Sequence, residues 1–135
     1  MNLEEKLKLV KEAQSFSYSP YSHFKVGAVL IFKDGSIVSG CNVENASYGL
    51  SNCAERTAIF KAVSMGKNLK EAVELLIIGE SNRPVSPCGA CRQVMAELLN
   101  KDTKITLFSQ NGDVKETNVE ELLPYSFNDE DLNGK

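Results

Sequence analysis

The sequence lacks any apolar run that approaches the ~18 residues needed to cross a membrane. Its N-terminus, MNLEEKLKLVKEA, is charged and amphipathic, so it lacks the apolar segment of a secretory signal. These absences favour a cytoplasmic protein, in which thiols stay reduced. The four cysteines, two of them in a Cys-x-x-Cys, therefore favour metal or thiol chemistry over a disulfide framework.

Long clusters of lysine and arginine are also missing, and the formal net charge is −3. The absence of a basic stripe argues against a nucleic-acid partner and suits a small neutral or cationic substrate better. No internal repeat, low-complexity segment or linker is visible, and 135 residues are typical of one domain with a real core. We expect a single domain over residues 1–135, with a flexible polar tail over about 128–135.

Hydrophobic periodicity alternates between helical and extended patterns along the chain. It predicts an amphipathic helix over about residues 3–16, then two strands in FKVGAVLIFKDGSIVSGCNVE joined at an Asp-Gly turn. A helix follows Cys53, AVELLIIGE is a strand, and PCGACRQVMAELLN opens another helix. KITLFSQ and DVKETN are two more strands, and VEELLP is a short helical turn. This order predicts an α/β fold, a three-layer α/β/α sandwich with a mixed five-stranded sheet.

Three cysteines stand near the starts of two predicted helices. Cys53 lies in SNCAERTA, and Cys88 and Cys91 lie in PCGACRQ. Helix N-termini stabilise thiolates, and two of them can converge at the ends of the strands. The stretch PCGAC alone fits a zinc site about as well as a redox dithiol or two core cysteines. The third cysteine favours metal binding.

A tetrahedral zinc ion needs a fourth ligand, which can be a side chain in a structural site or water in a catalytic one. Cys41 ends a predicted strand without a motif partner, and His23, the only histidine, lies in a loop. We therefore favour an open site of three thiolates and one water, with the Glu55 carboxylate close to the metal. Without the cysteines, Glu55 is simply a first-turn glutamate that complements the helix dipole.

The motifs Cys-Ala-Glu and Pro-Cys-x-x-Cys resemble the signature of the zinc nucleoside deaminases. More narrowly, the chain resembles the small homotetrameric cytidine deaminases. The matching segments are YSPYSHFKVGAVL, GCNVENASYGLSNCAERTAIFKAV, SPCGACRQVMAEL and ELLPYSF, between about Tyr18 and Phe127. The resemblance implies one zinc per subunit and hydrolytic deamination of cytidine and 2′-deoxycytidine to uridine and 2′-deoxyuridine plus ammonia, in pyrimidine salvage.

By this resemblance Cys53, Cys88 and Cys91 bind zinc, and Glu55 is the proton shuttle while zinc-bound hydroxide attacks C4 of the base. Three thiolates (−3) and Zn²⁺ (+2) leave the centre with a formal charge of −1, which makes its water less acidic. The resemblance therefore implies that Arg56 donates to a ligand thiolate. A surface salt bridge is the alternative role of Arg56.

Substrate contacts follow from the same resemblance. At a strand end, Asn42 and Glu44 alternate onto one face, and the matching pair in the family binds the ribose, chiefly its 3′-OH. Tyr48 and Phe127 resemble residues that reach the pocket of a neighbouring subunit, so the active sites are expected to be shared. The implied substrate-binding set is Phe24 against the pyrimidine, the backbone of Ala54 at the base edge, Asn42, Glu44, Tyr48 and Phe127.

Several alternatives stay open. A blasticidin-type aminonucleoside deaminase shares the zinc motif, although the Asn-x-Glu and Phe127 favour the nucleoside enzyme. Polynucleotide, guanine and tRNA-adenosine deaminases usually place histidine where Cys53 stands. From other classes, Cys41 can close a non-catalytic four-cysteine zinc module, or Cys88 and Cys91 can serve a thiol redox protein. The chain departs from the family at Val29, often alanine, and in its extension beyond Phe127.

Overall fold

A computed structural model describes residues 1–134 of the chain. Its centre is one five-stranded sheet in the order β2-β1-β3-β4-β5, in which only β3 and β4 pair in parallel. The strands are β1 (Val26–Phe32), β2 (Ile37–Cys41), β3 (Ala72–Gly79), β4 (Lys104–Phe108) and β5 (Val114–Asn118). The mixed sheet with helices on both faces confirms the predicted α/β/α sandwich.

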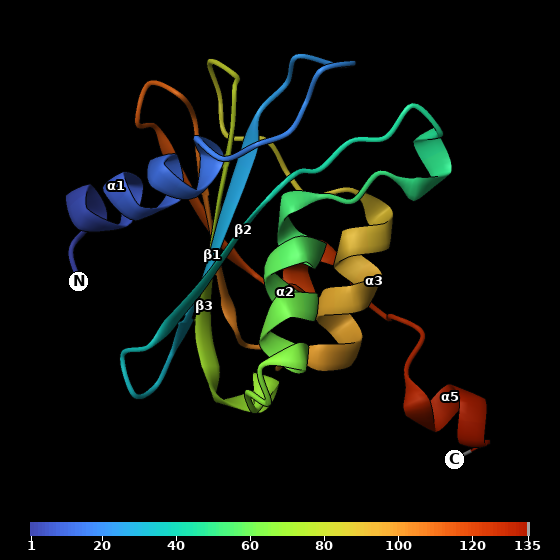
Figure 1. Ribbon diagram of the computed structural model, residues 1–135. Helices are drawn as coiled ribbons and strands as arrows, with labels where there is room; N and C mark the ends of the chain where they lie inside the picture. The colour runs from blue at the N-terminus through green and yellow to red at the C-terminus, as the bar shows by residue number, and fades with distance from the viewer. Residues whose placement is uncertain (135) are drawn as a thin grey trace.

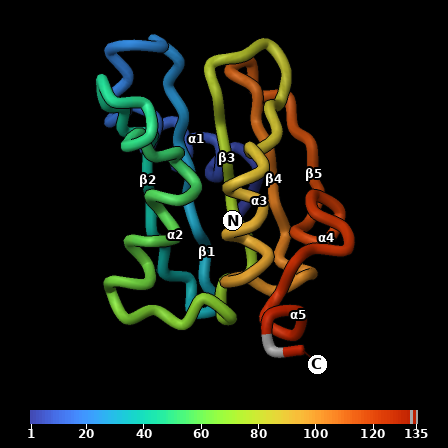
Figure 2. Tube along the Cα trace, turned by 90° about the vertical axis from the view of Figure 1, so that its right-hand side faces the viewer, coloured from blue at the N-terminus to red at the C-terminus, as the bar shows by residue number. Residues whose placement is uncertain are grey.

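The helices divide unequally between the two faces of the sheet. Helix α1 (Leu3–Gln14) covers one face, and α2 (Ala54–Ser64) and α3 (Gly89–Leu98) lie side by side on the other (Figure 1). Figure 2 shows α2 in front of β1 and β2, with α3 next to it on the side of β4. The short helices are η1 (Tyr48–Leu50), η2 (Leu69–Glu71), α4 (Val119–Leu122) and α5 (Asp129–Asn133).

Strand β1 is covered on both faces, as its nearly continuous apolar sequence predicts. Because side chains alternate along a strand, Ala28 and Leu30 join the core beneath α2 and α3. Val29 and Ile31 join the separate core beneath α1. The sheet therefore separates two apolar clusters.

Gly40 on β2 allows α2 to approach the sheet closely. A Cβ atom at this position would lie 2.5 Å from the backbone nitrogen of Ala58 and 2.9 Å from the carbonyl oxygen of Ala54. Any larger residue would have to push the helix away, because both atoms belong to rigid backbone. This contact fixes the first turn of α2 against the end of β2.

Three irregular segments meet beyond that end of the sheet. Tyr18, in the loop after α1, forms a parallel bridge with Val43, and Val43 forms an antiparallel bridge with Asn52. The backbone nitrogen of Tyr18 donates to the carbonyl of Asn42 at 3.0 Å, and that of Glu44 donates to the carbonyl of Tyr18 at 2.8 Å. The loop after α1, the segment after β2 and the approach to α2 thus support one another.

The polar tail carries the short helix α5. Its N-cap, Asn128, forms a capping box with Asp131. The flexibility expected for residues 128–135 stays a prediction, and residue 135 lies outside the described residues. Within residues 1–134, every helix is too short or too polar to span a lipid bilayer.

Candidate active site

The three predicted zinc-binding cysteines meet at the N-termini of α2 and α3. Cys53 and Cys88 are the N-cap residues of these helices, and Cys91 lies in the first turn of α3. The Sγ atom of Cys88 lies 3.4 Å from that of Cys91 and 3.9 Å from that of Cys53. Sulfurs bonded at about 2.3 Å to a tetrahedral zinc are roughly 3.8 Å apart, so this spacing fits one zinc ion.

The thiols of the cluster differ in how readily they ionise. A hydrogen bond from the Cys91 thiol is the largest influence that lowers the pKa of Cys53 to about 5, and the Arg56 guanidinium adds to it. The same bond to Cys53, together with burial, raises the pKa of Cys91. The cluster thus holds one negative charge readily and resists a second, as expected for thiols that ionise fully only around a metal.

Arg56 lies against the cluster rather than in an ion pair. Its Nη2 donates to Cys53 Sγ at 3.3 Å, and this bond is the main cause of its raised pKa. Its Nε is buried and has no hydrogen-bond partner within residues 1–134. This is the thiolate contact that the sequence-based hypothesis assigned to Arg56, and its effect on the chemistry stays a prediction.

Glu55 lies in the first turn of α2 and is 5% exposed. A glutamate that only complements a helix dipole would be solvated, whereas this one is buried beside the cysteines. Burial is the main cause that raises the pKa of its carboxyl, and the negative charge of Cys53 adds to it. A carboxyl of this kind can exchange a proton with a molecule bound in front of it.

A cavity of about 430 Å³ opens in front of Glu55, within the size range of small-molecule sites. Its wall combines apolar side chains with the polar ends of two loops. It is lined by Phe24, Val26, Asn42, Glu44, Tyr48, Ser51, Asn52, Cys53, Ala54, Glu55, Arg56, Ile77, Val85 and Ser86. All the predicted substrate-binding residues except Phe127 therefore border one cavity.

The amide of Asn42 is held on both sides. Its Oδ1 accepts a hydrogen bond from the Ser17 hydroxyl at 2.5 Å and another from the backbone nitrogen of Val26 at 2.9 Å. Its Nδ2 donates to the carbonyl of Phe24 at 2.8 Å. The amide is therefore fixed at the mouth of the cavity.

The Glu44 carboxylate is held by the loop after α1. Its Oε1 accepts from the backbone nitrogens of Tyr21 and Ser22, each at 3.0 Å, and the Ser22 hydroxyl donates to its Oε2. The bond from Ser22 is the main cause that lowers the pKa of Glu44. A fixed amide and a fixed carboxylate thus line the same cavity.

Some predicted candidates lie elsewhere. Within residues 1–134, the only group of potential metal ligands consists of Cys53, Cys88 and Cys91, so Cys41 and His23 are not part of it. Phe127 is 58% exposed and outside the cavity lining, and its carbonyl accepts from Gln93 Nε2 at 2.9 Å. Tyr48 borders the cavity although it is 75% exposed.

Sequence reasoning missed several residues of the site. Ser51, Asn52, Val85 and Ser86 precede the cysteine motifs, and this adjacency was a usable signal. Ser17 and Ser22 support Asn42 and Glu44 across more than 20 residues of chain. No local pattern marks such contacts.

Comparisons with known proteins agree with this geometry. Residues 1–107 match the family model described as the cytidine and deoxycytidylate deaminase zinc-binding region. A cytidine deaminase of Halalkalibacterium halodurans is 55% identical over 128 residues, covering 93% of this chain and 96% of the relative. The crystal structure of cytidine deaminase from Burkholderia pseudomallei superposes with a TM-score of 0.91 at 47% identity, covering 94% of this chain and 100% of that one. That from Mycobacterium tuberculosis gives 0.79 at 32% identity, covering 94% and 98%.

Proposed function

Because the chain belongs to the family of cytidine and deoxycytidylate deaminases with a zinc-binding region, we propose that it deaminates cytidine and 2′-deoxycytidine. Water and the nucleoside are converted to uridine or 2′-deoxyuridine and ammonia. One observation carries this proposal: the buried Glu55 and Cys53, one member of a cluster of three thiols, line the same cavity of about 430 Å³. The activity places the enzyme in pyrimidine salvage, and we place it in the cytoplasm.

Cys53, Cys88 and Cys91 hold one zinc ion per chain in this proposal. The ion supplies a Lewis acid that makes water nucleophilic near neutral pH. Arg56 donates to the Cys53 sulfur and withdraws part of the negative charge that three thiolates place on the site. Cys41 stays a free thiol on β2.

Glu55 moves the protons. It accepts a proton from the attacking water as the C4–O bond forms, and it protonates ring N3, which makes C4 more electrophilic. It then takes the second proton from the new C4 hydroxyl, which becomes the carbonyl, and passes it to the amino group as the C4–N bond breaks, so that ammonia leaves. Its burial beside the cavity suits this work, because a water-filled pocket would let bulk solvent compete for each proton.

The remaining lining residues bind the nucleoside. The Phe24 ring packs against the pyrimidine, the backbone of Ala54 contacts the base edge, and Asn42 and Glu44 bind a sugar hydroxyl, chiefly the 3′-OH. A hydroxyl both donates and accepts, so it suits an amide N–H next to a carboxylate oxygen.

We further propose a homotetramer in which active sites are shared. Tyr48 and Phe127 are exposed aromatic residues on this chain, and each gains contacts if it enters the cavity of a neighbouring subunit. Dilution below the dissociation point should then lower the specific activity together with the sedimentation coefficient. A monomeric preparation that keeps full activity contradicts the shared site.

The competing interpretations have less support. The relatives described above are named cytidine deaminases, which disfavours a blasticidin-type enzyme. Cys41 lies outside the thiol cluster, which disfavours a closed four-cysteine module.

The decisive experiment follows the loss of cytidine absorbance with purified protein and measures zinc per chain in the same preparation. We expect turnover of cytidine and 2′-deoxycytidine with one zinc per chain. Cys41→Ser should keep both the zinc and the turnover. Zinc without turnover of either nucleoside, or zinc lost with Cys41, contradicts the proposed function.

A further inference from the structure

The loop after α1 supports the two polar residues at the mouth of the cavity through its serine side chains. Ser17 reaches Asn42 and Ser22 reaches Glu44, while the backbone of Tyr18 between them bridges to Val43. Ser17 is half-buried and does not line the cavity. The direct side-chain link from Ser17 to a cavity-lining residue is its hydrogen bond to Asn42.

The orientation of the Asn42 amide is unambiguous. The backbone nitrogen of Val26 can only donate, so the amide atom that it contacts is the oxygen. The carbonyl of Phe24 can only accept, so the atom facing it is the nitrogen. The Ser17 hydroxyl is thus the second donor to Oδ1, at 2.5 Å.

A hydroxyl has one hydrogen to donate, and this fixes which residue donates in each hydrogen bond of the series Ser19–Ser17–Asn42. The Ser17 hydrogen is used on Asn42 Oδ1, so the contact of 3.1 Å between Ser17 and the buried Ser19 is a donation from Ser19 to Ser17. Hydrogen bonds in such a chain polarise one another. Two donors on the amide oxygen draw electron density from the amide nitrogen and make its hydrogens better donors.

One of those two hydrogens is free for a ligand. The first Nδ2 hydrogen is donated to Phe24, and the second has no partner within residues 1–134, although Asn42 lines the cavity. Glu44 offers a carboxylate oxygen beside it, at the same cavity.

We propose that Ser17 is a positioning residue for substrate, because its hydroxyl fixes and polarises the Asn42 amide that donates to a sugar hydroxyl. The proposal rests on the proposed function and adds to it a residue that never touches the nucleoside. Ser17 then contributes to binding only when the substrate carries the hydroxyl that Asn42 contacts.

The test combines a protein variant with a substrate variant. Ser17→Ala should lower kcat/KM for cytidine by roughly three- to tenfold, mostly through KM, because one hydrogen bond to the positioning amide is lost. With 3′-deoxycytidine the same substitution should change kcat/KM by less than about twofold, because the contact it supports is already missing. Ser17→Thr keeps the hydroxyl and should restore most of the loss.

Ser15→Ala is the matched control in the same loop. The Ser15 hydroxyl donates to the carbonyl of Glu12 at 2.6 Å and, among the described residues, forms no hydrogen bond with Asn42. Its loss should leave both substrates unaffected. Equal losses on cytidine and 3′-deoxycytidine for Ser17→Ala indicate a general structural role and overturn the proposal, as does no loss on either.

A second measurement separates this proposal from the proposed function. If the zinc-loaded wild type turns over no cytidine, the proposed function fails. The side-chain amide signals of Asn42 in NMR spectra then test Ser17 independently. We expect Ser17→Ala to shift these signals and to speed their exchange with water, whereas unchanged signals overturn the positioning role.

Discussion

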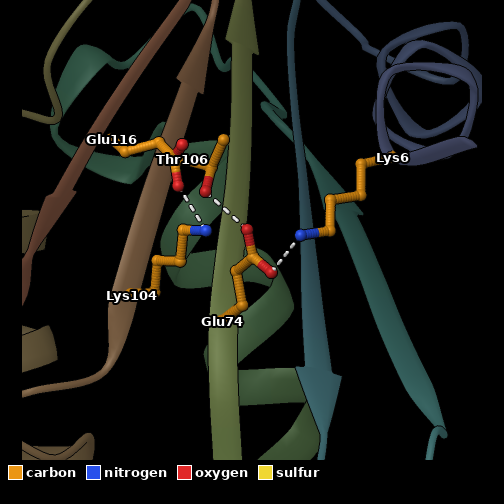
Figure 3. Close-up of polar contacts among 5 residues, drawn as sticks. All are labelled: Lys6, Glu74, Lys104, Thr106 and Glu116. Carbon is orange, nitrogen blue, oxygen red and sulfur yellow. Dashed lines mark hydrogen bonds and ion pairs between the residues drawn. The ribbon is translucent and has the colours of Figure 1, made fainter. Parts of the chain in front are cut away.

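Two buried glutamates, one on each side of the sheet, differ sharply in their surroundings. Glu74 on β3 is 7% exposed and Glu55 on α2 is 5% exposed. Glu74 accepts from the Lys6 ammonium at 2.7 Å and from the Thr106 hydroxyl at 2.5 Å (Figure 3). Within residues 1–134 no lysine or arginine forms an ion pair with Glu55, which faces the cavity instead.

The difference is the one expected between a structural carboxylate and a proton carrier, which is the role that we propose for Glu55. Fixed partners on α1 and β4 compensate the burial of Glu74 and hold it in one state. A proton carrier must change partners during a reaction, so permanent donors would oppose its work. Burial without an ion-pair partner raises the pKa of Glu55 and carries a cost in stability, which is typical of functional sites.

Removing each negative charge by the same substitution is the most severe test of the two roles. Glu55→Gln should lower kcat by roughly 10²–10⁴-fold, because the proton carrier is lost. It should leave zinc content and stability unchanged or slightly improved, because an unpaired buried charge is removed. Cytidine turnover, zinc analysis and urea unfolding measure the three quantities.

Glu74→Gln is the matched control for that substitution. It should leave kcat within about twofold of the wild type, since Glu74 contacts Lys6 of α1 and does not line the cavity. It should lower the free energy of unfolding by about 1–3 kcal/mol, because Lys6 loses a buried partner. A Glu55→Gln variant that keeps its activity, or a Glu74→Gln variant that loses it, reverses the assignment of the two roles.

Glu55 lies in a short sequence motif, whereas the partners of Glu74 come from distant segments, and this difference decides which features could be predicted from the sequence. Cys53, Glu55, Cys88 and Cys91 lie in two short motifs at helix starts, so adjacency alone brings them to one place once the fold is assumed. The fold itself follows from periodicity, since helices and strands alternate clearly. The close approach of α2 to the sheet also has a local sequence feature, the glycine at position 40.

Contacts between segments that are distant in the chain could not be predicted from the sequence. The pattern of AVELLIIGE predicts a strand, but it does not reveal that this strand buries Glu74, whose partners Lys6 and Thr106 come from α1 and β4. No local pattern predicts the role of Ser17 either, because its contact with Asn42 depends on how the loop after α1 lies against β2. Registers and loop paths are set by packing across the whole domain, and local patterns do not encode them.

The polar cluster of Figure 3 also contains a second lysine–glutamate pair, Lys104 and Glu116, which is more exposed than Lys6 and Glu74. The side chains of Lys6 and Glu74 are 13% and 9% exposed, whereas those of Lys104 and Glu116 are 43% and 50% exposed. Lys6→Met leaves the Glu74 carboxylate buried without its cation and should cost about 3 kcal/mol in urea unfolding. Lys104→Met, the same change in the more exposed pair, should cost less than about 1 kcal/mol, because water solvates Glu116.

The double variant Lys6→Met/Glu74→Leu tests the reason for that loss. If the cost of Lys6→Met is the desolvation of an unpaired carboxylate, then replacing the carboxylate as well should recover most of the lost stability. Thr106 then keeps an unpaired hydroxyl, so we expect the recovery to fall short of the wild type by about 1 kcal/mol. A double variant as unstable as Lys6→Met means that the loss does not come from the unpaired charge of Glu74, and the desolvation explanation then fails.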